Sequence, residues 1–96
     1  MSTIVDRLRY EIQQADAVIL AALAKRLFYT QQLGEYKVTE RLNIINPVVE
    51  QQNRTRLQAA RKPHVPAYLV DNVFDAIVDA SLHQQYTLKR RAAASE

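Results

Sequence analysis

The chain has 96 residues and a formal net charge of +3, and its composition, 48% hydrophobic and 24% charged, is that of one soluble globular domain rather than a disordered chain. The absence of cysteine excludes a disulfide framework and a thiolate metal site, and two histidines are too few to form a metal site by themselves. One glycine and three prolines favour helices over the turns of a sheet protein, so we expect a single all-α domain over residues 1–96 with no metal and no cofactor.

The first predicted element is one very long helix over residues 2–42. Apolar side chains recur every three or four residues from Ile4 to Leu23, which places them on one helical face. The same spacing then reaches Arg26 and Lys37, so two cations occupy core-facing positions about three turns apart. Buried charge is costly unless it is paired, so each cation either extends to solvent, meets a carboxylate or lines an anion site. Two cations on one stripe favour the anion site.

The length of this helix predicts a partner. A helix of about 40 residues is about 60 Å long, whereas a compact chain of this size has a radius of gyration of about 12–13 Å. The part of the helix that its own chain does not bury can be covered by a second copy of the chain related by a two-fold axis, so we expect an intertwined homodimer. Within the helix, Gly34 either marks the close approach of another backbone or is a tolerated defect.

Two further helices are expected. Asn46 and Pro47 are favoured at the N-cap and at the first position of a helix, so a short second helix covers residues 47–61, and its polar sequence is typical of a lid. A link with two prolines precedes a medium-length third helix over residues 66–89. The basic and alanine-rich tail, residues 90–96, is expected to fray.

The third helix also carries polar residues on its apolar stripe. Ser81 and Gln85 are one turn apart on the inward face. Read alone, they would be a buried polar pair bonded to backbone. Read together with Arg26 and Lys37, they predict an anion-binding pocket with no nucleophile, no metal and no obvious base.

Signals for a membrane or a nucleic acid are weak. The N-terminus lacks a basic-then-apolar leader, and the longest apolar run, residues 17–24, is too short to span a bilayer. Basic residues cluster only at residues 89–91, with no stripe of cations interleaved with aromatics. We therefore expect a cytoplasmic protein with no membrane and no nucleic-acid partner.

Several stretches share the residue types and spacing of one known family, and these stretches are residues 8–12, 15–16, 19–20, 23–26, 34–37, 74–81 and 84–85. Over nearly its whole length the chain resembles the all-α family of small chorismate mutases, which includes related isochorismate-pyruvate lyases and 4-amino-4-deoxychorismate mutases. The resemblance implies three helices per chain in an intertwined helical homodimer. It also implies an isomerase of aromatic amino-acid biosynthesis, in the shikimate pathway, or of specialised metabolism.

The resemblance further implies a set of site residues for a small dianionic substrate. Catalytic roles fall to Lys37, Gln85 and Glu50, and substrate-binding roles to Arg9, Arg26, Ser81, Asn46 and Val49, with Arg9 contributed across subunits. In the rearrangement of chorismate to prephenate, the arginines would clamp carboxylates, and Ser81 would help to fix one of them. Lys37 and Gln85 would donate to the ether oxygen, and Glu50 would accept from the ring hydroxyl.

Two positions depart from the family pattern. Many members have an aspartate where this chain has Asn46, and an arginine where it has Val49. These departures leave open a 4-amino-4-deoxychorismate mutase or an isochorismate-pyruvate lyase. An alternative of another class is a non-catalytic helical dimer or regulatory module whose pocket has degraded.

Overall fold

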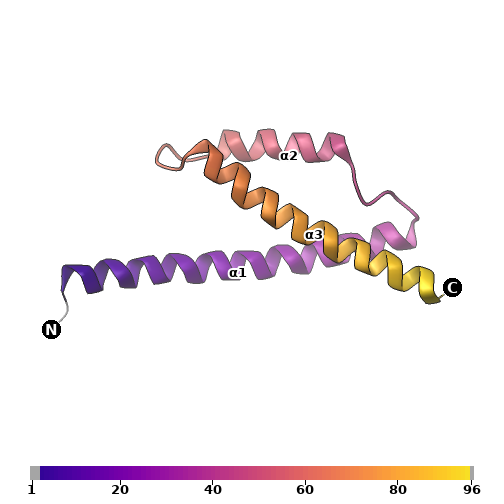
Figure 1. The fold of residues 1–96 in the computed structure, drawn as a ribbon, viewed down its shortest axis with the longest axis horizontal. Helices are drawn as coiled ribbons and strands as arrows, with labels where there is room; N and C mark the ends of the chain where they lie inside the picture. The colour runs from indigo at the N-terminus through magenta and orange to yellow at the C-terminus, as the bar shows by residue number, and fades with distance from the viewer. Residues whose placement is uncertain (1–2, 96) are drawn as a thin grey trace.

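The computed structural model describes residues 3–95, which form three α-helices and no strand. Helix α1 spans Ile4–Thr39, α2 spans Pro47–Ala60 and α3 spans Ala67–Ser95 (Figure 1). The predicted all-α fold, with one very long, one short and one medium helix, is confirmed for these residues. The predicted helix start at residue 2 lies outside the described residues.

Helix α1 is closed at both ends by local hydrogen bonds. At its start the Thr3 hydroxyl accepts from the Asp6 N–H at 3.0 Å, and the Asp6 carboxylate accepts from the Thr3 N–H at 3.2 Å, which forms a capping box. At its end Arg41 has a φ of 56°, and the Leu42 N–H donates to the Lys37 carbonyl at 2.8 Å. Such a left-handed residue stops a helix, so α1 ends at Thr39, three residues before the predicted end at about residue 42.

The predicted start of the second helix is confirmed. The Asn46 side-chain oxygen accepts from the Val49 N–H at 3.3 Å, and Pro47 occupies the first turn, where its missing N–H has no cost. These two residues set the point at which the chain turns back toward α3.

The predicted frayed tail is wrong within the described residues, because α3 continues past residue 89 to Ser95. Residues 92–94 are alanines, which have the highest helix propensity. The Ser95 hydroxyl also donates to the Arg91 carbonyl at 3.0 Å. Residue 96, the last of the predicted tail, lies outside the described residues.

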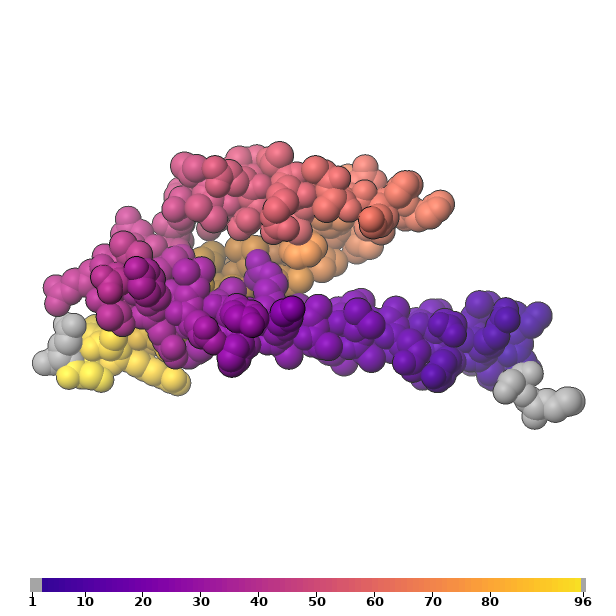
Figure 2. All heavy atoms as spheres, turned by 180° about the vertical axis from the view of Figure 1, so that it is seen from behind, coloured from indigo at the N-terminus to yellow at the C-terminus, as the bar shows by residue number. Residues whose placement is uncertain are grey.

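Helix α3 is the element that joins the fold. It crosses α1 and packs against both other helices, whereas α1 and α2 do not pack directly on each other (Figure 1). The N-terminal end of α1 projects beyond the rest of the chain (Figure 2). The molecule measures 62 × 29 × 15 Å with a radius of gyration of 17.7 Å, well above the value for a compact chain of this length.

Burial within one chain is sparse and largely polar. Ser81 and Gln85 are 5% and 3% exposed, while Ile44 and Val70 are the buried large apolar side chains among residues 3–95. By contrast, four large apolar members of the α1 stripe are more than half exposed, namely Ile4, Leu8, Ile12 and Ile19. Of the described helices, none has a segment long and apolar enough to span a membrane.

Candidate active site

A cluster of polar side chains lies where α3 crosses α1, and we call it the crossing cluster. Its α1 members are Arg26, Thr30 and Lys37, and its α3 members are Ser81, Gln84 and Gln85. The stripe positions of both helices face each other here, so polar residues meet at the place where the pattern calls for core. The structure therefore brings together four of the residues predicted from sequence, together with two others.

Arg26 is held by a hydroxyl rather than by a carboxylate. Its Nη1 donates to the Ser81 Oγ at 3.0 Å, and that hydroxyl donates in turn to the Ile77 carbonyl at 3.0 Å. Burial lowers the pKa of Arg26, and the positive charge of Arg56 lowers it further. Among residues 3–95 the salt bridge is Arg54–Asp75, so the Arg26 guanidinium keeps donors available for an anion.

Lys37 and Gln85 form the second pair of the cluster. The Lys37 Nζ donates to the Ile44 carbonyl at 2.9 Å and to the Gln85 Oε1 at 3.4 Å, while the Gln85 Nε2 donates to the Thr30 carbonyl at 3.4 Å. If the Gln85 amide were flipped, its NH₂ group would face the Lys37 ammonium, and two donors would meet. Lys37 therefore fixes the orientation in which the Gln85 Oε1 faces it. A half-buried cation and a buried amide are thus fixed side by side.

Gly34 explains how this amide comes so close to α1. A Cβ at position 34 would lie 2.8 Å from the Gln85 Cγ and 2.9 Å from the Leu88 Cδ1, which is closer than real contacts allow. Of the two interpretations of this glycine, close approach is therefore correct, although the approaching group is a side chain and not a backbone.

The sequence interpretation missed two members of the cluster. The Thr30 Oγ1 donates to the Gln84 Oε1 at 2.7 Å, and the Gln84 Nε2 donates to the Leu27 carbonyl at 3.0 Å. These bonds tie the two helices together beside Gln85. Thr30 lies on the same stripe as Arg26, so its position was available as a signal, whereas Gln84 lies at the edge of its stripe.

The predicted residues of α2 lie apart from the crossing cluster. Asn46 caps the helix, Val49 is 44% exposed, and neither contacts Lys37 or Gln85 by a hydrogen bond within residues 3–95. Glu50 lines a groove of about 270 Å³ between α2 and α3, whose floor includes Leu57, Val70 and Phe74. The carboxylates around this groove are those of Glu50, Asp71, Asp75 and Asp79.

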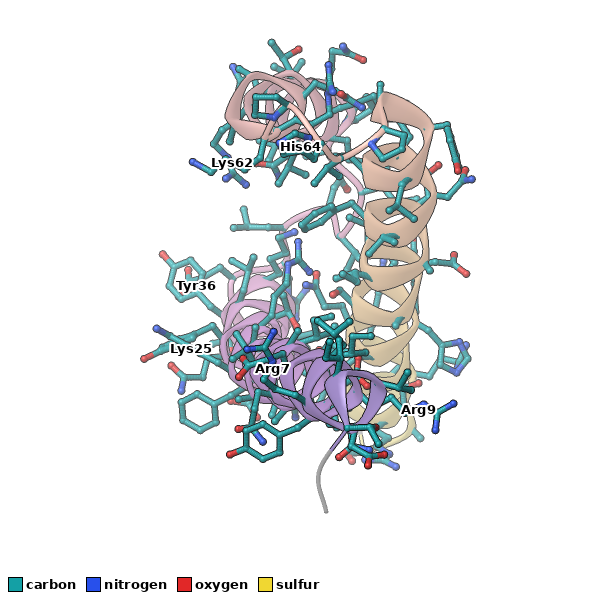
Figure 3. The ribbon with its side chains drawn as sticks, turned by 90° about the vertical axis from the view of Figure 1, so that its left-hand side faces the viewer. Arg7, Arg9, Lys25, Tyr36, Lys62 and His64 are labelled. Carbon is teal, nitrogen blue, oxygen red and sulfur yellow. The ribbon has the colours of Figure 1, made fainter. Side chains whose placement is uncertain are left out.

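Arg9 is distant from the cluster of its own chain. It precedes Arg26 by 17 positions on α1, which separates the two by about 25 Å along the helix axis. Figure 3 shows Arg9 pointing away from α2. A role for Arg9 at a crossing cluster therefore requires a second copy of the chain.

The fold and the crossing cluster define a small helical protein in which cations and amides are held together by hydrogen bonds between two helices. Within residues 3–95, no three histidine or carboxylate side chains are grouped as a metal site would require. A family model described as chorismate mutase type II matches residues 8–86, and the chain therefore belongs to this family. Searches of curated proteins and of solved structures gave no significant match.

Proposed function

We propose that the protein is a chorismate mutase, which converts chorismate to prephenate by holding the substrate folded and stabilising charge in the transition state. The observation that carries the proposal is the Lys37–Gln85 pair, fixed beside the Arg26–Ser81 pair at the crossing cluster. The match to the chorismate mutase type II family supports it at the level of the reaction class. We place this activity in the cytoplasm and in aromatic amino-acid biosynthesis.

The reaction itself makes modest demands on a protein. It is unimolecular, it breaks an ether C–O bond as a C–C bond forms, and it needs no proton transfer. A catalyst must bind two carboxylates in one geometry and stabilise the negative charge that gathers on the ether oxygen. In the proposal Arg26 and Ser81 hold a carboxylate, while the Lys37 ammonium and the Gln85 amide face the ether oxygen.

The proposed enzyme is a homodimer in which Arg9 enters the partner's site. The exposed apolar stripe on the N-terminal half of α1 supports this proposal, since large contiguous apolar surfaces mark interaction sites. The separation of Arg9 from its own crossing cluster gives the second reason. Glu50 would accept from the ring hydroxyl across the top of the site, with Asn46 and Val49 nearby on the first turn of α2.

Product analysis tests the proposal. Purified protein is offered chorismate, isochorismate and 4-amino-4-deoxychorismate separately, and the products are identified; we expect prephenate from chorismate. A pyruvate-releasing reaction on isochorismate would instead make the protein a lyase. No turnover of any of the three compounds would favour the non-catalytic helical dimer, for which the departure at Val49 is the best argument.

A matched pair of lysine variants links the activity to the site. Lys37→Ala should lower kcat by roughly 100-fold or more, as the loss of an oxyanion donor does in other enzymes. Lys25 lies on the same helix but points away from α3 (Figure 3), so Lys25→Ala serves as the control with unchanged kcat. Equal rates for the two variants would contradict the proposed role of Lys37.

A further inference from the structure

Two side-chain bonds show which side of helix α2 is turned toward α3 and away from α1. The Arg54 Nη2 meets the Asp75 Oδ1 at 3.0 Å, and the Gln58 Nε2 donates to the Asp71 Oδ1 at 2.8 Å. At about 100° per residue, Asp71 and Asp75 lie about 80° around α3 from Ser81 and Gln85, which face α1. The Arg54 side of α2 therefore packs on a flank of α3 that differs from the flank facing α1.

Arg56 lies on the opposite side of α2. Arg56 follows Arg54 by two residues, so the two side chains point about 200° apart around the helix. It follows Val49 by seven residues, almost two full turns, so Val49 and Arg56 point in nearly the same direction. Val49 and Arg56 thus share one face, two turns apart, and this face is turned toward α1. Figure 1 shows α2 running alongside the middle of α1, and Figure 3 shows α3 standing to one side of both helices, so that α3 does not fill the space between them.

The charges of Arg56 and Arg26 reach each other across this space. The Arg56 charge depresses the pKa of Arg26, after burial, which has the larger effect. Within residues 3–95 neither guanidinium has a carboxylate partner, and Arg56 makes no hydrogen bond to the protein. Two facing cations without an anion between them repel each other. A bound anion would remove this repulsion, so the arrangement favours the anionic complex over the unliganded protein.

We propose that Arg56 is a substrate-binding residue that holds one carboxylate together with Arg26, and so replaces the cation that is absent at Val49. This inference rests on the proposed chorismate mutase function. The replacement moves the α2 cation by two turns, about 10 Å, away from Lys37 and toward Arg26. A planar guanidinium on each side binds a carboxylate with paired donors, which also fixes the end of the substrate remote from the ether oxygen.

The test compares arginine variants on one helix. Arg56→Ala should raise the KM for chorismate, and the Kd measured by titration calorimetry, roughly tenfold or more with little change in kcat. Arg56→Lys should recover part of the affinity. Arg54→Ala removes an exposed salt bridge on the other side of α2 and should leave both constants within twofold. The losses from Arg26→Ala and Arg56→Ala should combine less than additively, because both would hold the same carboxylate.

Stability separates binding from a structural role. Because Arg56→Ala removes repulsion from Arg26, the unliganded variant should unfold at the same urea concentration as wild type or at a higher one. Unchanged KM and Kd in Arg56→Ala, or losses equal to those of Arg54→Ala, would overturn the inference. A wild type that binds chorismate without converting it refutes the proposed function alone, and the Kd series still decides the role of Arg56. A wild type that does not bind chorismate overturns both proposals.

Discussion

Gly34→Ala is the substitution whose consequence follows most directly from the geometry. The added methyl group would meet the Gln85 Cγ at 2.8 Å and the Leu88 Cδ1 at 2.9 Å. Leu88 offers the end of a flexible side chain and is able to rotate. The Gln85 Cγ is close to its backbone, so relief there must move the whole amide or separate the two helices.

Two opposing effects set the magnitude of the change in stability. Alanine is favoured over glycine in a helix by about 1 kcal/mol, whereas overpacking a tight contact costs about 1–3 kcal/mol. We therefore expect a net loss of about 0–2 kcal/mol in the free energy of unfolding. The effect on activity should be larger, because the Lys37 Nζ and the Gln85 Oε1 are already 3.4 Å apart and a shift of a few tenths of an ångström breaks their bond.

Rates and unfolding measured side by side test this reasoning. Gly34→Ala should reduce kcat for chorismate by roughly tenfold, part of the loss that removing an oxyanion donor causes. In a Gln85→Ala background the contacting Cγ is absent, so Gly34→Ala should cause little further loss of rate. A Gly34→Ala protein with the wild-type kcat and a higher stability would show that the 2.8 Å contact has no consequence.

Two further predictions concern the substrate and the assembly. Glu50→Ala should lower kcat/KM tenfold to hundredfold for chorismate and 4-amino-4-deoxychorismate. The loss for isochorismate should be smaller, because its C4 lacks a group that pairs with a carboxylate. Equal losses on all three compounds would mean that Glu50 serves the fold and not the substrate. The thermal unfolding midpoint should rise with protein concentration, as for any dimer whose chains fold together; sedimentation of a well-folded monomer at micromolar concentration would contradict the dimer and the role of Arg9.

The sequence predicted the helices well because their signals are local. The three-and-four spacing from Ile4 onward requires only neighbouring residues, and Asn46 with Pro47 forms a start signal that the structure confirms. The end of α1 was not predictable in the same way. Arg41 takes a left-handed conformation that is usually adopted by glycine, and the arginine at this position gives no sequence signal for a helix end.

The crossing cluster was predictable in its membership and not in its pairing. Cations and hydrogen-bonding side chains on two apolar stripes identify Arg26, Lys37, Ser81 and Gln85, because such residues are out of place in a core. Which of them pair depends on the crossing angle of α1 and α3 and on the loop that presents the Ile44 carbonyl to Lys37. The facing arrangement of Arg26 and Arg56 depends on the path of α2, which a pattern within one helix does not specify.

The distribution of buried side chains connects the fold to the proposed assembly. One chain buries Ser81 and Gln85 while it exposes Ile4, Leu8, Ile12 and Ile19, which reverses the usual preference. Full burial of such a side chain contributes about 1.5–3 kcal/mol, so covering the stripe is comparable to the total stability of a small domain. Arg9 follows Leu8 directly in sequence and borders this stripe on the helix surface, so a contact that covers the stripe would also bring Arg9 to the partner chain. In the proposed dimer, folding and completion of the active site are then one event, and a chain without its partner lacks both.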